Sequence, residues 1–304
     1  MINKDFNSVI ELIEAFPTEQ KCIDHLEQLR WNGNVVSPFD ENSIVYKCSK
    51  NRYRCKETGK YFNVKTATLF DNSKVPLQKW FLAIWLVTSH KKGISSLQLG
   101  RDIDVTQKTA WFMLQRIRNC FGFGNEGELG GEVEVDETFI GGRAKNKHLS
   151  KKIGDDKGGS GDKSPVIGMV ERKGTLVAKQ IPNVKGETLT KQMVSSIKIA
   201  TTVYSDEYHG YKKIKAIYDH KYVKHSAGQY VNDRVHTNTI EGFWSLLKRG
   251  IIGIYHFTSN KHLQKYVDEF VFRYNSRNFS EKNRFNLLLT NTEHRLTYSK
   301  LING

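Results

Sequence analysis

Residues 236–251 read His236-Thr-Asn-Thr-Ile-Glu-Gly-Phe-Trp-Ser-Leu-Leu-Lys-Arg-Gly-Ile251, and this pattern decides how the chain is interpreted. At about 100° per residue, a helix here gathers polar residues in one arc and apolar residues on the opposite side. The polar arc holds Asn238, Glu241, Ser245 and Lys248, and the apolar side holds Ile240, Phe243, Trp244, Leu246, Leu247 and Ile251. An acid and a base therefore face the same way, two turns apart. The alternative is a capping box, in which Asn238 is the N-cap and Glu241 bonds back to the backbone.

The composition favours an anionic partner. The chain has 304 residues with 47 Lys and Arg against 32 Asp and Glu, a formal net charge of +15. A positive field of this kind favours a polyanion, so nucleic acid is the expected partner, and a generically basic protein is the alternative. The sequence contains no apolar run of 18 residues and no signal-peptide pattern. We therefore expect a cytoplasmic, nucleoid-associated protein with no membrane partner.

The first 70 residues predict two small parts. Residues 1–30 have the pattern of a helical lead-in, and residues 31–70 change to turns and short β-like runs, which indicates a small basic β module. Two of the four cysteines, Cys48 and Cys55, lie in this module. Neither belongs to a Cys-x-x-Cys or Cys-x-x-His pair at a suitable distance, and so few irregular cysteines predict reduced thiols. We expect no zinc here.

Residues 75–120 predict a helix-turn-helix region. A short helical pattern, a turn near residues 102–105 and a longer helix follow one another. In this motif the second helix lies in the major groove of DNA. The residues expected to contact DNA are Thr106, Gln107, Lys108 and Thr109 at the start of that helix and Arg116 near its end. A helical hairpin that does not bind DNA is the alternative.

Residues 131–279 predict a larger domain with the element order β-β-β-α-β-α-β-α-α, and residues 280–304 are left as a C-terminal tail. The whole chain is thus a multidomain protein of α+β or α/β class, with a mixed sheet in its largest domain. Asp136 lies in the first strand, Asp206 ends the fourth, and Glu241 lies on the helix after the fifth. If the first and fourth strands are neighbours, the three carboxylates meet. Such a cluster suits Mg²⁺ or Mn²⁺, and two ions can activate water or a 3′ hydroxyl for in-line attack on phosphorus.

The first strand of this domain carries stacked acids. Residues 132–140 alternate, which places Glu132, Glu134 and Asp136 on one face and Val133 and Val135 on the other. Like charges on one face repel each other. The pattern therefore predicts either a cation beside this face or a face open to solvent.

Several runs resemble the DDE transposases of bacterial insertion sequences, in particular the ISXO-like group with a ribonuclease-H-like catalytic domain. The matching runs are residues 108–118, 133–142, 205–211, 236–250 and 266–275. The resemblance implies that Asp136 and Asp206 bind metal and that Glu241 is the third acid. In related groups an Asn takes that third role, which leaves Asn238 as a competing candidate. Lys248 would contact DNA near the cleaved phosphate, with Arg249 beside it.

The resemblance also implies an activity and its partners. The expected protein is an enzyme that binds terminal inverted repeats through the β module and the helix-turn-helix, cleaves a strand and joins it to target DNA as a homodimer or larger assembly. One departure is clear: members usually carry a zinc ribbon with two Cys-x-x-Cys pairs, whereas residues 37–40 are Ser-Pro-Phe-Asp and residues 55–58 are Cys-Lys-Glu-Thr. The alternatives are a catalytically inactive DNA-binding regulator or derivative and a nuclease that cuts without joining.

Overall fold

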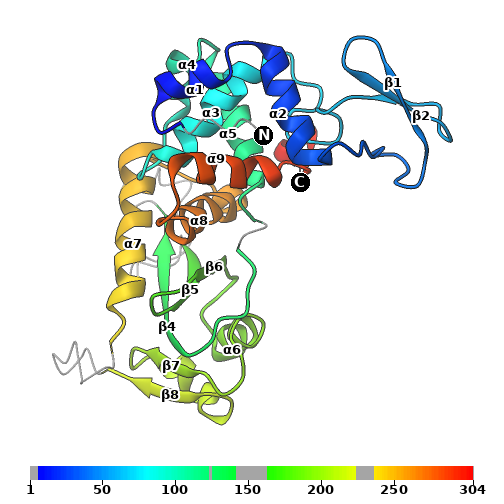
Figure 1. Cartoon of the computed structure of the whole chain (residues 1–304). Coiled ribbons are helices and arrows are strands. Elements are labelled where there is room, and N and C mark those ends of the chain that lie inside the picture. Colours follow the sequence, from blue (N-terminus) through cyan, green and yellow to red (C-terminus); the bar gives the residue numbers. More distant parts are fainter. Residues whose placement is uncertain (1–5, 123–124, 142–162, 224–235, 304) are drawn as a thin grey trace. The chain divides into compact units, whose positions relative to one another are not determined.

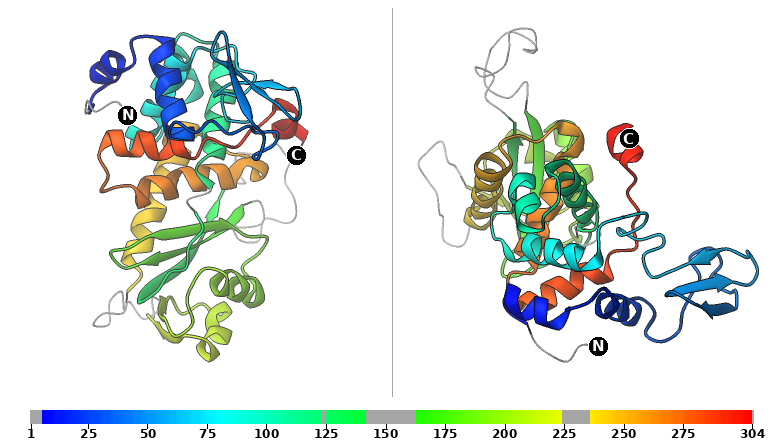
Figure 2. Two further views of the ribbon diagram at one scale, coloured as in Figure 1. Left: turned by 45° about the vertical axis from the view of Figure 1, so that its right-hand side comes forward. Right: turned by 90° about the horizontal axis from the view of Figure 1, so that it is seen from above.

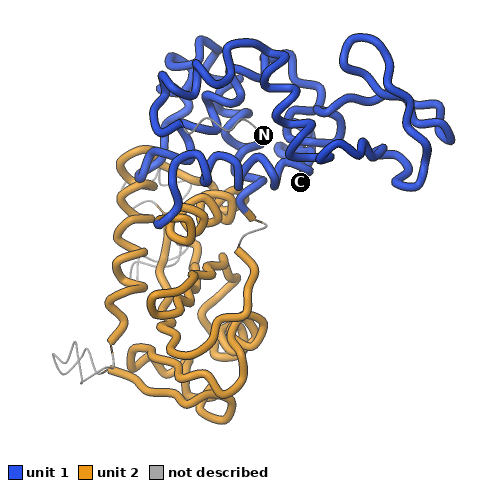
Figure 3. Tube along the Cα trace, in the orientation of Figure 1, with its two compact units in different colours: residues 1–121, 278–304 blue, residues 122–277 orange. Residues whose placement is uncertain are grey.

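The computed structural model describes residues 6–122, 125–141, 163–223 and 236–303. The chain forms two compact units (Figure 3), one made of residues 1–121 and 278–304 and the other of residues 122–277. We call them unit 1 and unit 2. In the part of the chain described, none of the helices has the length and apolar character needed to cross a membrane.

Unit 1 is built from helices contributed by both ends of the chain (Figure 1). They are α1 (Val9–Ala15), α2 (Glu19–Trp31), α3 (Leu77–Ser89), α4 (Ser96–Asp102), α5 (Gln107–Asn119), α9 (Glu281–Thr290) and α10 (Tyr298–Asn303). Phe285 of α9 is fully buried and its ring lies 5.4 Å from that of Phe81 and 5.6 Å from that of Phe6. The segment from residue 280 onward, which we expected to be a tail, therefore contributes α9 to a helical core.

The β module of unit 1 is a three-stranded antiparallel sheet (Figure 2). Its strands are β1 (Val45–Cys48), β2 (Arg52–Cys55) and β3 (Tyr61–Phe62). One face buries Tyr53 and Phe62, whose rings stack at 5.7 Å and meet Trp31 of α2. The other face exposes a row of cross-strand partners, which are Tyr46, Arg54 and Tyr61. Trp31 and the two buried rings thus supply a small apolar core for the module.

Helices α4 and α5 are joined by a short turn in which Asp104 has a φ of 51°. Gly100 permits this turn, because a Cβ there would lie 2.9 Å from the carbonyl oxygen of Val105. Thr106 caps α5 by accepting a hydrogen bond from the amide of Thr109. The helix, turn and helix expected from the sequence are present as secondary structure.

Arg116, which we expected to contact DNA, is buried inside unit 1. Arg116 is only 6 % exposed, and its guanidinium donates to the carbonyl oxygens of Leu296, Leu69 and Asp71 at 2.9–3.0 Å. Its role is to join α5 to two other segments of unit 1. The sequence interpretation placed it near a helix end with other cations, but burial on the inner face of α5 decides its partners.

Unit 2 contains a mixed five-stranded sheet of order β6-β5-β4-β7-β8 (Figure 1). The strands are β4 (Glu132–Ile140), β5 (Ser164–Glu171), β6 (Leu176–Gln180), β7 (Thr202–Ser205) and β8 (Asp219–Tyr222). Strands β4, β5 and β6 pair antiparallel, whereas β7 pairs parallel with both β4 and β8. The expected mixed sheet, with its first and fourth strands as neighbours, is confirmed.

Helices cover both faces of this sheet. They are α6 (Gly186–Val194), the 3₁₀ helix η4 (His209–Ala216), α7 (Asn238–Gly250), the π-helix η6 (Ile251–Tyr255) and α8 (Asn260–Asn275). On one face, α7 and α8 pack over Val166 and Val170 of β5. On the other face, α6 and η4 pack over Val133 and Val135 of β4. Alternation along β4 therefore turns Glu134 and Asp136 towards the α7 side.

Candidate active site

Helix α7 presents its two faces as the sequence pattern predicts. Its apolar side is buried in the core between α8 and the sheet, and Leu246 alone among the expected apolar residues is half-buried. The polar arc, which holds Asn238, Glu241, Ser245 and Lys248, is exposed. The capping-box alternative is wrong, because the N-cap is Thr237 and Asn238 is the first helical residue. Thr237 instead donates its hydroxyl to Oε1 of Glu241 at 2.9 Å.

The two aspartates lie on neighbouring parallel strands. The register pairs Glu132 with Thr202 and Glu134 with Tyr204, an offset of 70 residues (204 − 134 = 70). The pairing ends with Glu134 and Tyr204, and Asp206 directly follows β7. If the same offset continued for two more residues, Asp206 would lie opposite Asp136 (206 − 136 = 70). Since neighbouring strands are about 4.8 Å apart, the two carboxylates would then lie close together.

Asp136 is held by α7 and repelled by its neighbours. The indole Nε1 of Trp244 donates to its Oδ2 at 3.0 Å. Burial raises the pKa of Asp136 to about 6 from 3.8, and the charges of Asp206 and Glu241 raise it further, while hydrogen bonds from Trp244 and the amide of Glu137 lower it. Both other acids of the expected triad are thus close enough to disfavour the charge on Asp136.

This donor set fits a divalent cation. Carboxylate oxygens are the ligands that Mg²⁺ and Mn²⁺ prefer, and a bound cation would offset both the burial and the neighbouring charges that raise the pKa of Asp136. In the described ranges, no three acidic, histidine or cysteine side chains are already gathered closely enough to hold a metal ion. The carboxylates of Asp206 and Glu241 are therefore near enough to act on Asp136, but the three side chains do not form a closed metal site.

Comparison with known proteins identifies the family of this chain. Residues 128–275 match the model of the ISXO2-like transposase domain. An uncharacterized protein in the transposable element ISH50 of Halobacterium salinarum is 32 % identical over 253 residues, which are 78 % of this chain and 84 % of that protein. The chain belongs to the ISXO2-like transposase family.

Solved complexes of Mos1 transposase are also similar to this ISXO2-like transposase, but weakly. The strand transfer complex is 10 % identical, with 71 % of this chain and 79 % of that chain covered and a TM-score of 0.27. The pre-cleavage transpososome is 11 % identical, with 95 % and 97 % covered and a TM-score of 0.25. Scores this low carry no argument about fold or function.

A fourth acid of the transposase lies beside the triad and was missed from the sequence. Glu137 accepts a hydrogen bond from the hydroxyl of Tyr211, which is fully buried on η4. Burial raises the pKa of Glu137 to about 7, the Tyr211 bond lowers it, and the charges of Asp136 and Asp206 raise it. In the sequence, the only indication of this fourth acid was that Glu137 directly follows Asp136. The two side chains lie on opposite faces of β4, so Glu137 has a different partner, Tyr211.

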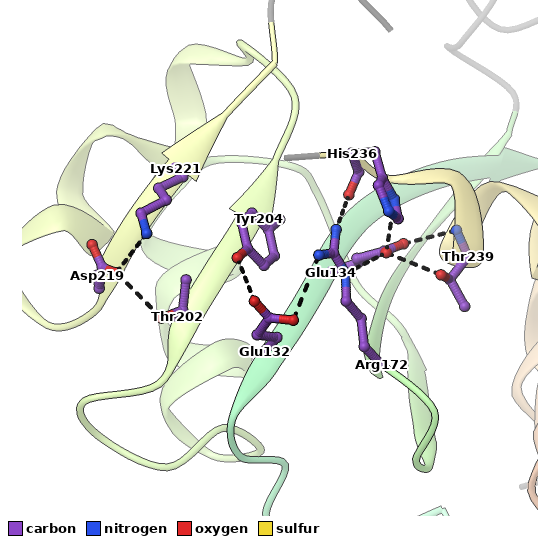
Figure 4. A network of polar contacts seen from close by, with 9 residues as sticks. All are labelled: Glu132, Glu134, Arg172, Thr202, Tyr204, Asp219, Lys221, His236 and Thr239. Atoms are coloured by element: carbon purple, nitrogen blue, oxygen red, sulfur yellow. Dashed lines mark hydrogen bonds and ion pairs between the residues drawn. The ribbon is translucent and has the colours of Figure 1, made fainter. Parts of the chain in front are cut away.

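A buried polar network lies between strand β4 and the first turn of α7 (Figure 4). Glu134, which is 0 % exposed, lies between the guanidinium of Arg172 and the first turn of α7. Of the two alternatives for the stacked acids of β4, a neighbouring cation or open solvent, the structure shows the cation. It is Arg172, which lies 2.9 Å from Glu134 and 3.6 Å from Glu132. It comes from the turn after β5, and no sequence spacing indicated it.

The basic residues of α7 lie at its other end. Lys248 and Arg249 are exposed in the last turn, where cations favour the helix dipole. Arg249 donates through Nε to the carbonyl oxygen of Ser245 at 3.1 Å. Lys248 stays on the same exposed arc as Glu241, two turns away.

Proposed function

We propose that unit 2 is the ribonuclease-H-like catalytic domain of a DNA transposase and that Asp136, Asp206 and Glu241 hold Mg²⁺ or Mn²⁺ in it. The observation that supports the proposal is the parallel pairing of β4 with β7, since its offset, continued by two residues, would bring Asp206 opposite Asp136. Glu241 is included because its charge also acts on Asp136, although burial and the charge of Asp206 raise the pKa of that carboxyl more. Two divalent ions would supply an activated water or 3′ hydroxyl and neutralise the leaving oxygen at phosphorus.

The residues of this chain have separate tasks in that reaction. The three carboxylates provide the negative charge that binds the cations, and Trp244 orients the carboxylate of Asp136 through the indole hydrogen bond. Lys248 would contact a DNA phosphate near the cleaved bond, since its ammonium is exposed on the same arc of α7.

The third metal-binding residue is Glu241 in this proposal, and Asn238 is the competing candidate. Both are exposed on α7 within one turn of each other. Glu241 is favoured because its charge acts on Asp136, and because a carboxylate binds a hard cation more strongly than an amide oxygen does. Separate Glu241→Ala and Asn238→Ala variants decide between them, since the true ligand should match the loss seen with Asp206→Ala.

DNA recognition is assigned to unit 1 and to the end of α7. Thr106, Gln107 and Lys108 are exposed at the start of α5, with Thr109 half-buried beside them. The exposed row of the β module adds Tyr46, Arg54 and Tyr61. The guanidinium of Arg54, and that of the exposed Arg52 on the same strand, lie 5.9 and 5.5 Å from the centre of the Tyr61 ring. Arginine and aromatic side chains on one open face suit nucleic acid. Lys248 and Arg249 would bind near the cleaved strand, and zinc is not part of this proposal.

The deciding experiment is a strand cleavage and joining assay on DNA that carries the element's ends, with Mg²⁺, Mn²⁺ or EDTA. Wild type should cleave and join only with metal, and Asp206→Ala should abolish both steps while DNA binding stays near wild type. Asp219→Ala is the matched control, because Asp219 is an exposed acid on the neighbouring strand β8 that pairs with Lys221. Retained activity in Asp206→Ala would refute the metal site.

The same assay tests two further classes of function. Specific DNA binding without cleavage under any metal would identify an inactive regulator or derivative, and cleavage without joining would identify a nuclease. Joining two element ends to one target requires more than one active site, so we expect a homodimer or larger assembly on DNA. Light scattering of the complex with paired ends measures that state.

A further inference from the structure

Helix α7 begins without a side-chain cap of its own. Its N-cap Thr237 makes no capping hydrogen bond, although the first N–H groups of a helix have no partner within it. Two of these groups are satisfied from a distant strand, because Oε2 of Glu134 accepts from the amides of Thr239 at 2.8 Å and Ile240 at 3.2 Å. Oε1 of Glu134 also accepts from the Thr239 hydroxyl at 3.0 Å. A strand carboxylate therefore caps the helix and complements its dipole.

The carboxylate is held from its other side by a cation. Arg172 donates through Nε to Glu134 at 2.9 Å and through an Nη to the carbonyl oxygen of His236 at 3.0 Å (Figure 4). Its guanidinium also lies 4.1 Å from the ring centre of Tyr204 on β7. Burying a carboxylate is costly unless it is paired and hydrogen-bonded, and here both conditions are met. Arg172 thus fixes Glu134 and the segment that enters α7 together.

This arrangement links the strand of one proposed metal ligand to the helix of another. Glu134 precedes Asp136 by two residues on the same face of β4, and the amide of Ile240 that it binds directly precedes Glu241. We propose that Glu134 is a positioning residue, whose carboxylate sets the first turn of α7, and with it Glu241 and Asn238, against Asp136 and Asp206. The proposal rests on the metal-dependent function proposed above.

The expected effect follows from how metal ligands are oriented. Residues that hold ligands without touching the metal change metal affinity or activity by roughly 10–100-fold when they are replaced. Glu134→Gln keeps the shape of the side chain but removes the charge that pairs with Arg172 and caps the helix. We expect it to lower the cleavage rate by about 10–100-fold and to raise several-fold the Mg²⁺ concentration needed for half-maximal cleavage. DNA affinity should change little, whereas the Tm should fall, because the buried guanidinium of Arg172 loses its charged partner and α7 loses its cap.

Glu132→Gln is the matched control. Glu132 lies on the same strand and face and also approaches Arg172, at 3.6 Å, but its side chain is 42 % exposed and its hydrogen bond goes to Tyr204 instead of α7. Its cleavage rate and Mg²⁺ requirement should stay within about twofold of wild type, since its hydrogen bond goes to Tyr204 and not to the helix that carries Glu241. Full-length protein is used throughout.

Three results separate the possible failures. Wild type that never cleaves with metal would refute the proposed function, and amide hydrogen exchange at Thr239 and Ile240 would then still test the positioning role, because only Glu134→Gln should accelerate it. Unchanged exchange, or a Mg²⁺ requirement equal to wild type, would overturn the role of Glu134. If Glu134→Gln fails to fold, Thr239→Val removes only the hydroxyl donor and should shift the Mg²⁺ requirement in the same direction by a smaller factor.

Discussion

At the scale of single residues, Asp136 is a site where function opposes stability. Its pKa is raised from 3.8 to about 6, so the folded protein favours the neutral carboxyl. The resulting contribution to the free energy of unfolding is fully present below pH 3.8 and is lost as the pH rises through 6. Without divalent ions at pH 8, Asp136→Asn removes this unfavourable buried charge and keeps an oxygen for the indole of Trp244. We expect the free energy of unfolding to rise by on the order of 1–3 kcal/mol, at about 1.36 kcal/mol per pKa unit, as measured by urea denaturation.

Two controls belong to this prediction. At pH 4 the gain should disappear, because the wild-type carboxyl is then mostly protonated in the folded protein. Mg²⁺ should raise the Tm of wild type more than that of Asp136→Asn, since binding to the folded state stabilises it in proportion to affinity. A variant that is less stable than wild type at pH 8 in EDTA would contradict the conclusion that the charge on Asp136 is unfavourable in the folded protein.

At the scale of elements, the seat of α7 on the sheet depends on a glycine. Gly168 of β5 pairs with Asp136, and a Cβ at this position would lie 2.6 Å from Cζ2 of Trp244 and 2.7 Å from Cδ1 of Ile240. Gly168→Ala should therefore destabilise the protein by about 1–3 kcal/mol by overpacking and should push α7 away from β4. Loss of cleavage activity beyond the loss of folded protein, with a shifted Trp fluorescence maximum, is the expected readout.

The matched control lies on α7 itself. Gly242 is exposed, and a Cβ there would meet nothing within 4 Å. Gly242→Ala should stabilise the helix by up to about 1 kcal/mol, because alanine favours helices over glycine. If both variants changed stability in the same direction, the close approach at Gly168 would not be the cause.

What the sequence predicted at this scale, and what it missed, follows from distance along the chain. The alternation in β4 and the helical period of α7 are local patterns, and both were predicted. The sequence also predicted that β4, which carries Asp136, pairs with β7, which directly precedes Asp206. The pairing of Glu134 with Arg172 and the burial of Arg116 depend on partners many residues away. No period or spacing encodes such contacts, since tertiary packing alone selects them.

At the scale of the whole molecule, unit 1 is completed by the C-terminal residues. Phe285 of α9 is 0 % exposed and its ring packs against those of Phe6, Phe16 and Phe81. Phe285→Ala should cost about 3–5 kcal/mol, because it removes a large buried ring and leaves a cavity. Unit 2 does not include this residue, so limited proteolysis should cut unit 1 first and leave a fragment within residues 122–277.

Leu287→Ala on the same helix separates packing from helix propensity. Leu287 is 36 % exposed, so its replacement should cost far less than that of Phe285. Calorimetry should show the Phe285→Ala loss in only one of two unfolding transitions, because each unit has its own core. A loss shared equally by both transitions would contradict the independence of the units. In Phe285→Ala, DNA binding should fall together with the stability of unit 1, while divalent ions should still stabilise unit 2.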